Sequence, residues 1–182
     1  MQLNNKYHYN LPLLLTAINL RKLLNLGWKI KCKDKVIDAS VPGDVTIDFF
    51  NAGLIENPYF GKNYKSCEWI SRSDYEYEKT FEINENELKS DSIEIFFKGI
   101  DLFGEIILNN KIIGNTNNAF LLYKFDIKNY LKVGLNTLVV KMKSTLNEMD
   151  KIDTTGYYAI FNLPRMFVRK PQCHFGWDWA PK

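Results

Sequence analysis

The chain has 182 residues, of which 46% are hydrophobic and 25% are charged, so it is long enough to form one domain with a hydrophobic core. Its 24 Lys and Arg residues against 21 Asp and Glu residues leave a formal net charge of +3, and lysines and glutamates alternate along the sequence. Because a nucleic-acid-binding domain gathers its basic residues into a patch or stripe, this pattern argues against a nucleic-acid partner.

The first apolar segment is "LPLLLTAINL", residues 11–20. It is too short to cross a bilayer, which takes about 20 apolar residues. It also lacks the basic start and the small-residue cleavage site of a signal peptide. We therefore predict an ordinary strand or helix here, no membrane partner, and a cytoplasmic protein.

The next segments predict two strands followed by a turn and a helix. Residues 27–32 ("GWKIKC") alternate apolar and polar side chains, and residues 36–41 ("VIDASV") run into a Pro-Gly turn signal. Asp44 is a suitable N-cap, the residues after it have apolar side chains at helical spacing, and Gly53 can end a helix. One short helix is therefore expected near residues 45–52.

Alternation with a period of two continues through most of the remaining chain, in residues 73–83, 92–99, 104–116, 119–127 and 136–144. The chain also contains 12 Phe, 10 Tyr and 4 Trp, and aromatic residues favour strands. These segments are short, and they follow one another at nearly regular intervals. They predict further strands with little helix between them.

Asn109 and Asn110 stand between two apolar runs, and because Asn tolerates positive φ they predict a two-residue hairpin turn. The set then contains about eight strands. Such a set predicts an all-β fold, an antiparallel jelly-roll β-sandwich with little helix besides residues 45–52. No repeat or linker is visible, so residues 1–182 are expected to form a single domain. From Leu146 the regular pattern gives way to an aromatic-rich segment that we expect to be packed.

The sequence offers no metal site and no cofactor motif. Its cysteines are few, odd in number and far apart, which favours buried free thiols over disulfides or zinc ligands: Cys32, Cys67 and Cys173. His8 and His174 are the two histidines, and only Asp178 stands at a ligand-like spacing from His174. Neither a glycine-rich phosphate loop nor a nucleophile elbow is present. We therefore predict no metal and no cofactor.

A glycosidase would need a pair of catalytic carboxyl groups. Glu76 and Glu78 lie on one face of a predicted strand, about 6.7 Å apart along it. The opposite face has Tyr75, Tyr77 and Phe81, so the two glutamates belong to the solvent face of an amphipathic strand. No catalytic residue is predicted in this chain.

The final residues, "RKPQCHFGWDWAPK", contain Trp177, Asp178 and Trp179. Aromatic rings pack against the C–H face of a sugar, and a carboxylate accepts hydrogen bonds from its hydroxyl groups. Tryptophans also anchor many protein cores, however, and an aspartate can accept hydrogen bonds from nearby backbone N–H groups. From composition alone the structural interpretation is about twice as probable as a sugar site.

Several motifs nevertheless occur together and in one order. Residues 41–63 ("VPGDVTIDFFNAGLIENPYFGKN") resemble a signature near the start of the β-mannosidases of glycoside hydrolase family two. The Gly27-Trp28 pair, Trp69, "YEKTFEI" and "GIDLFGEIILNNKIIGNTNNAFLLYKFDI" are also similar to that family. The final "RKPQCHFGWDWAPK" resembles its Trp-Asp-Trp loop. The resemblance begins near residue 20 and leaves residues 1–20 as an N-terminal extension. Ala180 and Lys182 depart from it, because family members commonly have Gly and Arg there.

The resemblance implies a galactose-binding-domain-like jelly roll at the N-terminus of a retaining β-mannosidase, which hydrolyses terminal β-D-mannose residues. Immunoglobulin-like domains and a (β/α)₈ barrel with both catalytic glutamates would follow, so this chain would be an inactive fragment. Its partners would be those downstream domains and a β-mannoside oligosaccharide or glycoside. The implied substrate-binding residues are Asp178, which would accept hydrogen bonds from the sugar, Trp177, which would shape the pocket, and, with less support, His174 and Trp179.

Two other functions stay open. One is a free-standing carbohydrate-binding module, which an exposed aromatic platform on a sheet face would favour. The strand aromatics instead alternate into the predicted core. The other is a purely structural domain of another family-two glycosidase, a β-galactosidase or a β-glucuronidase.

Overall fold

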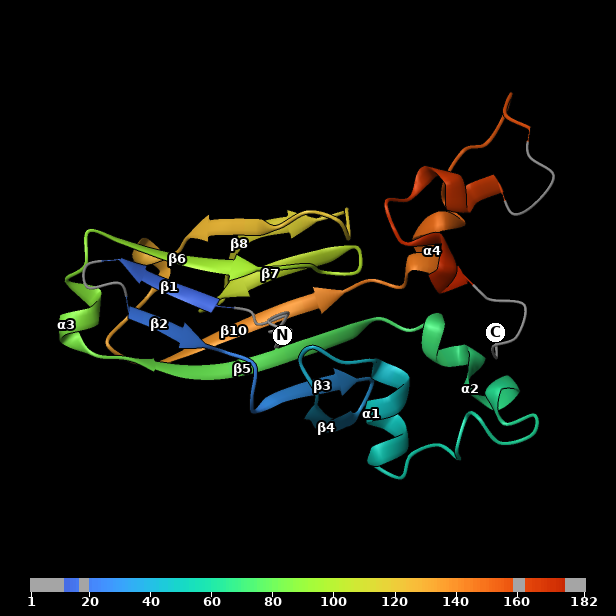
Figure 1. The fold of residues 1–182 in the computed structure, drawn as a ribbon, viewed down its shortest axis with the longest axis horizontal. Coiled ribbons are helices and arrows are strands. Elements are labelled where there is room, and N and C mark those ends of the chain that lie inside the picture. The colour runs from blue at the N-terminus through green and yellow to red at the C-terminus, as the bar shows by residue number, and fades with distance from the viewer. Residues whose placement is uncertain (1–11, 17–19, 159–162, 176–182) are drawn as a thin grey trace, which may run out of the picture.

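The computed structural model describes residues 12–16, 20–158 and 163–175 (Figure 1). Within these ranges ten strands form two sheets. The strands of the six-stranded sheet lie in the order β4 (Lys35–Ala39), β3 (Trp28–Cys32), β5 (Tyr75–Ile83), β10 (Gly134–Met142), β7 (Gly104–Leu108) and β8 (Lys111–Thr116). The four-stranded sheet has the order β2 (Leu20–Leu23), β1 (Pro12–Thr16), β6 (Ser92–Phe97) and β9 (Tyr123–Asp126).

The strand pairings within both sheets are antiparallel, as the sequence predicted. The apolar run at residues 11–20, which could have been strand or helix, contains β1, and β1 pairs with both β2 and β6. The structure thus has a largely antiparallel β architecture with two more strands than the eight predicted.

The main hydrophobic cluster takes buried residues from both sheets. It includes Trp28 and Ile83 of the six-stranded sheet and Ile93 and Ile95 of the four-stranded sheet. Alternating burial along β3, β6 and β7 confirms the period of two predicted for these segments. Burial of such side chains stabilises a domain by about 25 cal/mol per Å² of apolar surface, so these faces supply most of its stability.

The Asn109-Asn110 turn is confirmed. The two residues have φ angles of 49° and 66° and connect β7 to β8, with Leu108 paired to Lys111. Positive φ at both positions is the geometry of a type I′ hairpin, whose twist matches that of the flanking strands.

The predicted helix is present as α1 (Val45–Asn51). Asp44 caps it, because its Oδ1 accepts hydrogen bonds from the backbone N–H groups of Thr46 at 2.9 Å and Ile47 at 3.2 Å. Gly53 follows the helix with a φ of 69°, the left-handed conformation that glycine adopts without strain.

The expectation of little other helix was wrong. The described residues also contain α2 (Tyr64–Ser71), α3 (Glu85–Leu88), α4 (Thr145–Met149) and the 3₁₀ helices η1 (Lys128–Tyr130), η2 (Leu163–Phe167) and η3 (Gln172–Phe175). The N-cap residue of α2, Asn63, makes no side-chain capping hydrogen bond to the helix, and the helix buries Cys67 and Ile70 in a second hydrophobic cluster, so long-range packing decides its conformation. None of the helices in the described ranges is long and apolar enough to cross a membrane.

The short α3 begins with a capping box, and the glutamate of that box also forms an ion pair. Asn84 Oδ1 accepts from the Glu87 N–H at 2.9 Å, and Glu87 Oε2 accepts from the Asn84 N–H at 2.8 Å. Glu87 also forms an ion pair with Lys22 of β2, and its side chain is only 8% exposed. Burial alone would raise the pKa of Glu87, but the hydrogen bonds from Lys22 and from the Asn84 backbone bring it below its usual value.

We expect Glu87→Gln to lower the free energy of unfolding at pH 7 by about 1.5 kcal/mol, because the glutamine keeps the cap but loses the charge-assisted bond to Lys22. A carboxyl group whose pKa is lowered on folding stabilises the protein above its unfolded pKa, about 4.3, and the stabilisation disappears as the pH falls through the folded pKa. The wild type should therefore lose its advantage over Glu87→Gln in acid. Urea unfolding between pH 7 and pH 3 measures this, with exposed Glu85→Gln on the same helix as control. A difference between wild type and Glu87→Gln that does not change with pH would contradict it.

Candidate functional site at the carboxyl-terminal end

The predicted sugar-binding residues Trp177, Asp178 and Trp179 lie outside the described residues. The fourth predicted site residue, His174, belongs to η3, and 49% of its side chain is exposed. Its Nδ1 atom lies 3.0 Å from Oδ2 of Asp101. The structure therefore gives His174 a partner that the sequence analysis did not identify.

Asp101 lies in the loop between β6 and β7. Its neighbours in sequence, Ile100 and Leu102, are both buried, and its own side chain is 32% exposed. The same carboxylate oxygen that faces His174 also accepts from Nζ of Lys170, whose side chain is only 15% exposed. The carboxylate of Asp101 thus contacts both the Lys170 ammonium group and the His174 imidazole, which belong to the segment that precedes the Trp-Asp-Trp motif in the sequence.

The backbone holds this segment against the same end of the sheets. Val168 is buried with Leu102 and Met149 in a third hydrophobic cluster. The N–H of Ala119 donates to the carbonyl of Arg169 at 2.8 Å, within an isolated parallel bridge between residues 118 and 169. Figure 1 shows α4 and the 3₁₀ helices after it beyond the end of β10. Residues 168–175 therefore rest on loops of the sheets.

Two contacts also brace the loop that contains Asp101. The hydroxyl group of Thr116, at the end of β8, donates to the carbonyl of Leu102 at 2.8 Å. The same hydroxyl oxygen accepts from the N–H of Gly104 at 2.9 Å. The loop is consequently bound to β8 on one side and to the C-terminal segment on the other.

Sequence reasoning missed Asp101 and Lys170 as site-related residues. The only local signal was the "GID" stretch at residues 99–101, where the alternating pattern of β6 stops before β7 begins. Lys170 is one of many lysines in the chain and has no distinguishing context. Their contact joins residues 69 positions apart, which no local pattern can show.

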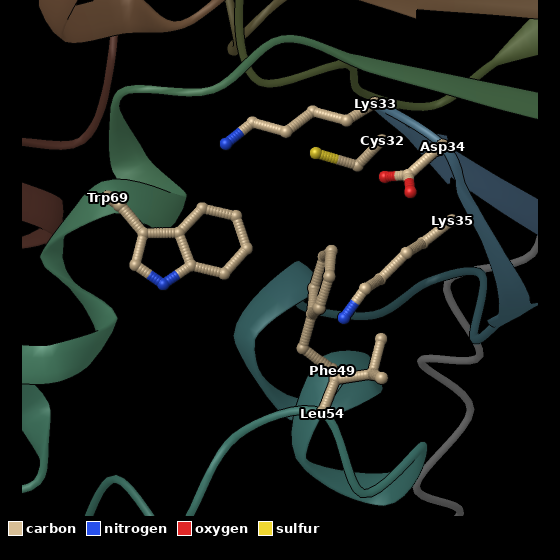
Figure 2. Close-up of a pocket in the computed structure, with 7 residues that line it drawn as sticks. All are labelled: Cys32, Lys33, Asp34, Lys35, Phe49, Leu54 and Trp69. Atoms are coloured by element: carbon tan, nitrogen blue, oxygen red, sulfur yellow. The ribbon is translucent and has the colours of Figure 1, made fainter.

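A pocket of about 200 Å³ lies elsewhere, between the β3–β4 hairpin and helices α1 and α2 (Figure 2). The indole of Trp69 lines it, together with Phe49 and Lys33. Phe49 meets Trp69 edge to face with 5.5 Å between the ring centroids, and Lys33 Nζ lies 5.2 Å from the Trp69 centroid. Because both groups already contact the indole, this tryptophan is not an open stacking platform for a sugar ring.

The structure places the three cysteines and the candidate carboxylate Glu76 in different surroundings. Cys32 and Cys67 are buried free thiols as predicted, but Cys173 was wrongly expected to be buried and is exposed, because η3 lies on the surface. Burial raises the pKa of Cys32, which lowers its reactivity. Glu76 Oε1 lies 3.5 Å from Lys141 Nζ, and the Glu76 side chain is 41% exposed. This agrees with the prediction that Glu76 lies on the solvent face of its strand. No group of three or more potential metal ligands occurs in the part of the chain that the structure describes.

Comparison with known proteins matches residues 28–182 to the family described as "Glycosyl hydrolase 2 galactose-binding domain-like". The mouse β-mannosidase is 34% identical over 171 residues, which are 87% of this chain and 19% of that protein. The crystal structure of a β-D-mannosidase from Dictyoglomus thermophilum superposes with a TM-score of 0.79 at 38% identity, over 85% of this chain and 20% of that one. An exo-chitosanase from Amycolatopsis orientalis shares the fold at 14% identity, with a TM-score of 0.58 over 64% of this chain and 16% of its own. The chain thus spans about a fifth of the length of the β-mannosidases it matches.

Proposed function

Because the chain belongs to the galactose-binding-domain-like family of glycosyl hydrolase 2, we propose that it is the N-terminal domain of a β-mannosidase that hydrolyses terminal β-D-mannose residues. The observation that carries the proposal is the similarity to β-mannosidases along most of the chain, at identities well above those of relatives that share only the fold. In this proposal the catalytic glutamates belong to a barrel domain outside this chain, and the two sheets close as a jelly-roll sandwich.

The role of this domain is to complete the substrate pocket. Asp178 accepts hydrogen bonds from hydroxyl groups of the terminal mannose, and Trp177 forms a wall of the pocket. Two features support this assignment: the Trp-Asp-Trp motif, and the firm attachment of the residues before it through Val168, Lys170 and His174. A binding loop must be held by rigid supports if its side chains are to meet a substrate in one orientation.

A free-standing carbohydrate-binding module would be favoured by exposed aromatics on a sheet face, whereas the strongly exposed aromatics among the described residues, such as Tyr59, Phe120 and Tyr158, lie in loops. The half-exposed Trp69 is covered by Phe49 and Lys33 instead of facing solvent on a sheet face. The other alternative, a structural domain of a β-galactosidase or β-glucuronidase, would predict a different substrate for the complete protein.

The proposal is tested by measuring hydrolysis of p-nitrophenyl β-D-mannoside, β-D-galactoside and β-D-glucuronide. We expect the complete protein to prefer the mannoside and the 182-residue chain to hydrolyse none of the three. Preference for the galactoside or the glucuronide would contradict the assignment to β-mannosidase. Turnover by the 182-residue chain alone would show that these residues contain the catalytic carboxylates.

A further inference from the structure

We propose that Asp101 is a positioning residue: through Lys170 and His174 it holds residues 170–174, the segment that precedes the Trp-Asp-Trp motif in the sequence. The inference rests on the proposed function for its kinetic consequence. Its structural part, the fixing of residues 170–174 by Asp101, is independent of any activity. No substrate contact is assigned to Asp101 itself.

The geometry of the carboxylate carries the proposal. A single oxygen, Oδ2, faces both Lys170 Nζ and His174 Nδ1, so one side chain ties two points four residues apart in the same segment. The last of these points lies three residues before Trp177.

The position of Asp101 in the fold makes it a suitable anchor. The adjacent Leu102 is fully buried, and its carbonyl accepts from the hydroxyl group of Thr116, so the backbone beneath the carboxylate has little freedom to move. Lys170, in contrast, belongs to a segment of 3₁₀ helices and loops with few regular backbone hydrogen bonds. Asp101 thus transfers the rigidity of the sheet loops to the C-terminal segment.

The other contacts between this segment and the sheets are apolar or are made by the backbone. Val168 and the Arg169 carbonyl attach the start of the segment to Met149, Leu102 and Ala119. Beyond them, Phe175 packs against the third hydrophobic cluster, and Gln172 Nε2 donates to the carbonyls of Arg165 and Lys170, at 3.4 Å each, within the segment itself. Among the described side chains, Asp101 is the one whose charge joins the end of this segment to the sheets.

The charge should matter more to the position of the segment than to global stability. Ion pairs that are partly exposed contribute little to folding, and the carboxylate is 32% exposed. A displaced binding segment, however, weakens substrate binding even where the fold is intact. Asp101→Asn preserves the size of the side chain and removes its charge. It therefore tests whether the charge fixes the position of the segment, with little change in global stability.

The first experiment measures hydrogen–deuterium exchange in the 182-residue chain. The backbone amides of Lys170 and of residues 172–175 should exchange at least about fivefold faster in Asp101→Asn than in the wild type, with β5 and β10 unchanged, because only the local opening equilibrium shifts. The matched control is Asp150→Asn, which removes a carboxylate that pairs with Arg72 at the same end of the molecule. Unchanged exchange of residues 170–175 in Asp101→Asn, or an equal acceleration in Asp150→Asn, would overturn the inference.

The second experiment uses the complete protein and p-nitrophenyl β-D-mannoside. Asp101→Asn should raise KM about five- to tenfold with less than a twofold change in kcat, because a displaced pocket wall weakens ground-state and transition-state binding alike. The double variant Asp101→Asn/His174→Gln should be no worse than Asp101→Asn alone, since His174 acts through the same tie. Additive effects, or a normal KM in Asp101→Asn, would overturn the positioning role. If the wild-type protein does not hydrolyse the mannoside, the proposed function fails, and the exchange experiment still decides what Asp101 does.

Discussion

Asp178→Ala in the complete β-mannosidase proposed here is expected to lower kcat/KM for an aryl β-mannoside by about ten- to a hundredfold. A charge-assisted hydrogen bond contributes about 1.5–3 kcal/mol, and 1.4 kcal/mol corresponds to a tenfold change in rate. The melting temperature should stay close to that of the wild type, because a carboxylate that serves to bind the substrate is expected to support little of the core. Steady-state kinetics and thermal melting of the same preparation measure both quantities.

Asp153→Ala provides a control in the same part of the sequence. Asp153 is exposed, and its carboxylate accepts a hydrogen bond from the N–H of Thr155 at 2.9 Å, an ordinary turn contact. Its replacement should leave kcat/KM within a factor of two. The opposite result for Asp178→Ala, a lower melting temperature with normal kcat/KM, would make Asp178 a structural cap and refute its assignment to the sugar.

Asn136→Ala is expected to lower the free energy of unfolding by about 3–5 kcal/mol, because it leaves several polar groups unpaired where Asn136 is completely buried. Asn136 Oδ1 accepts from Asn109 Nδ2 at 2.7 Å and from the Lys132 N–H at 2.9 Å. Its Nδ2 donates to the carbonyls of Lys132 at 2.8 Å and Gly134 at 2.9 Å. Removing this side chain deletes four hydrogen bonds at once.

The same network also holds the β7–β8 hairpin. Asn109 accepts from the Thr137 N–H at 3.0 Å and donates to the Tyr130 carbonyl at 2.8 Å, so it joins the turn to the start of β10. Urea unfolding is the appropriate measurement. Asn115→Ala, at an exposed position of β8, should change the stability by no more than about 0.5 kcal/mol. A loss below 1 kcal/mol in Asn136→Ala would show that water replaces the deleted bonds.

The sequence by itself determined the features whose causes are local. In β3 and β5 the side chains of successive residues point to opposite faces of the sheet. A strand with one buried face therefore shows a period of two in its sequence. Asp44 caps α1 through N–H groups two and three residues away, and the Asn109-Asn110 turn needs only two residues that tolerate positive φ. Such interactions extend over a few residues and leave a pattern in the chain.

Only the tertiary structure decided the features that depend on distant partners. The helical conformation of α2 depends on a cluster that includes Ile30 and Tyr75, and its N-cap residue, Asn63, makes no side-chain capping hydrogen bond. Likewise, Asp101 meets His174 across 73 positions, and Asn136 meets Asn109 across 27. In each case a common residue type gains its role from the neighbour that folding brings to it. Local patterns record which face of a strand is buried, whereas the partner of a buried or anchoring polar group is set by how the loops of the two sheets come together.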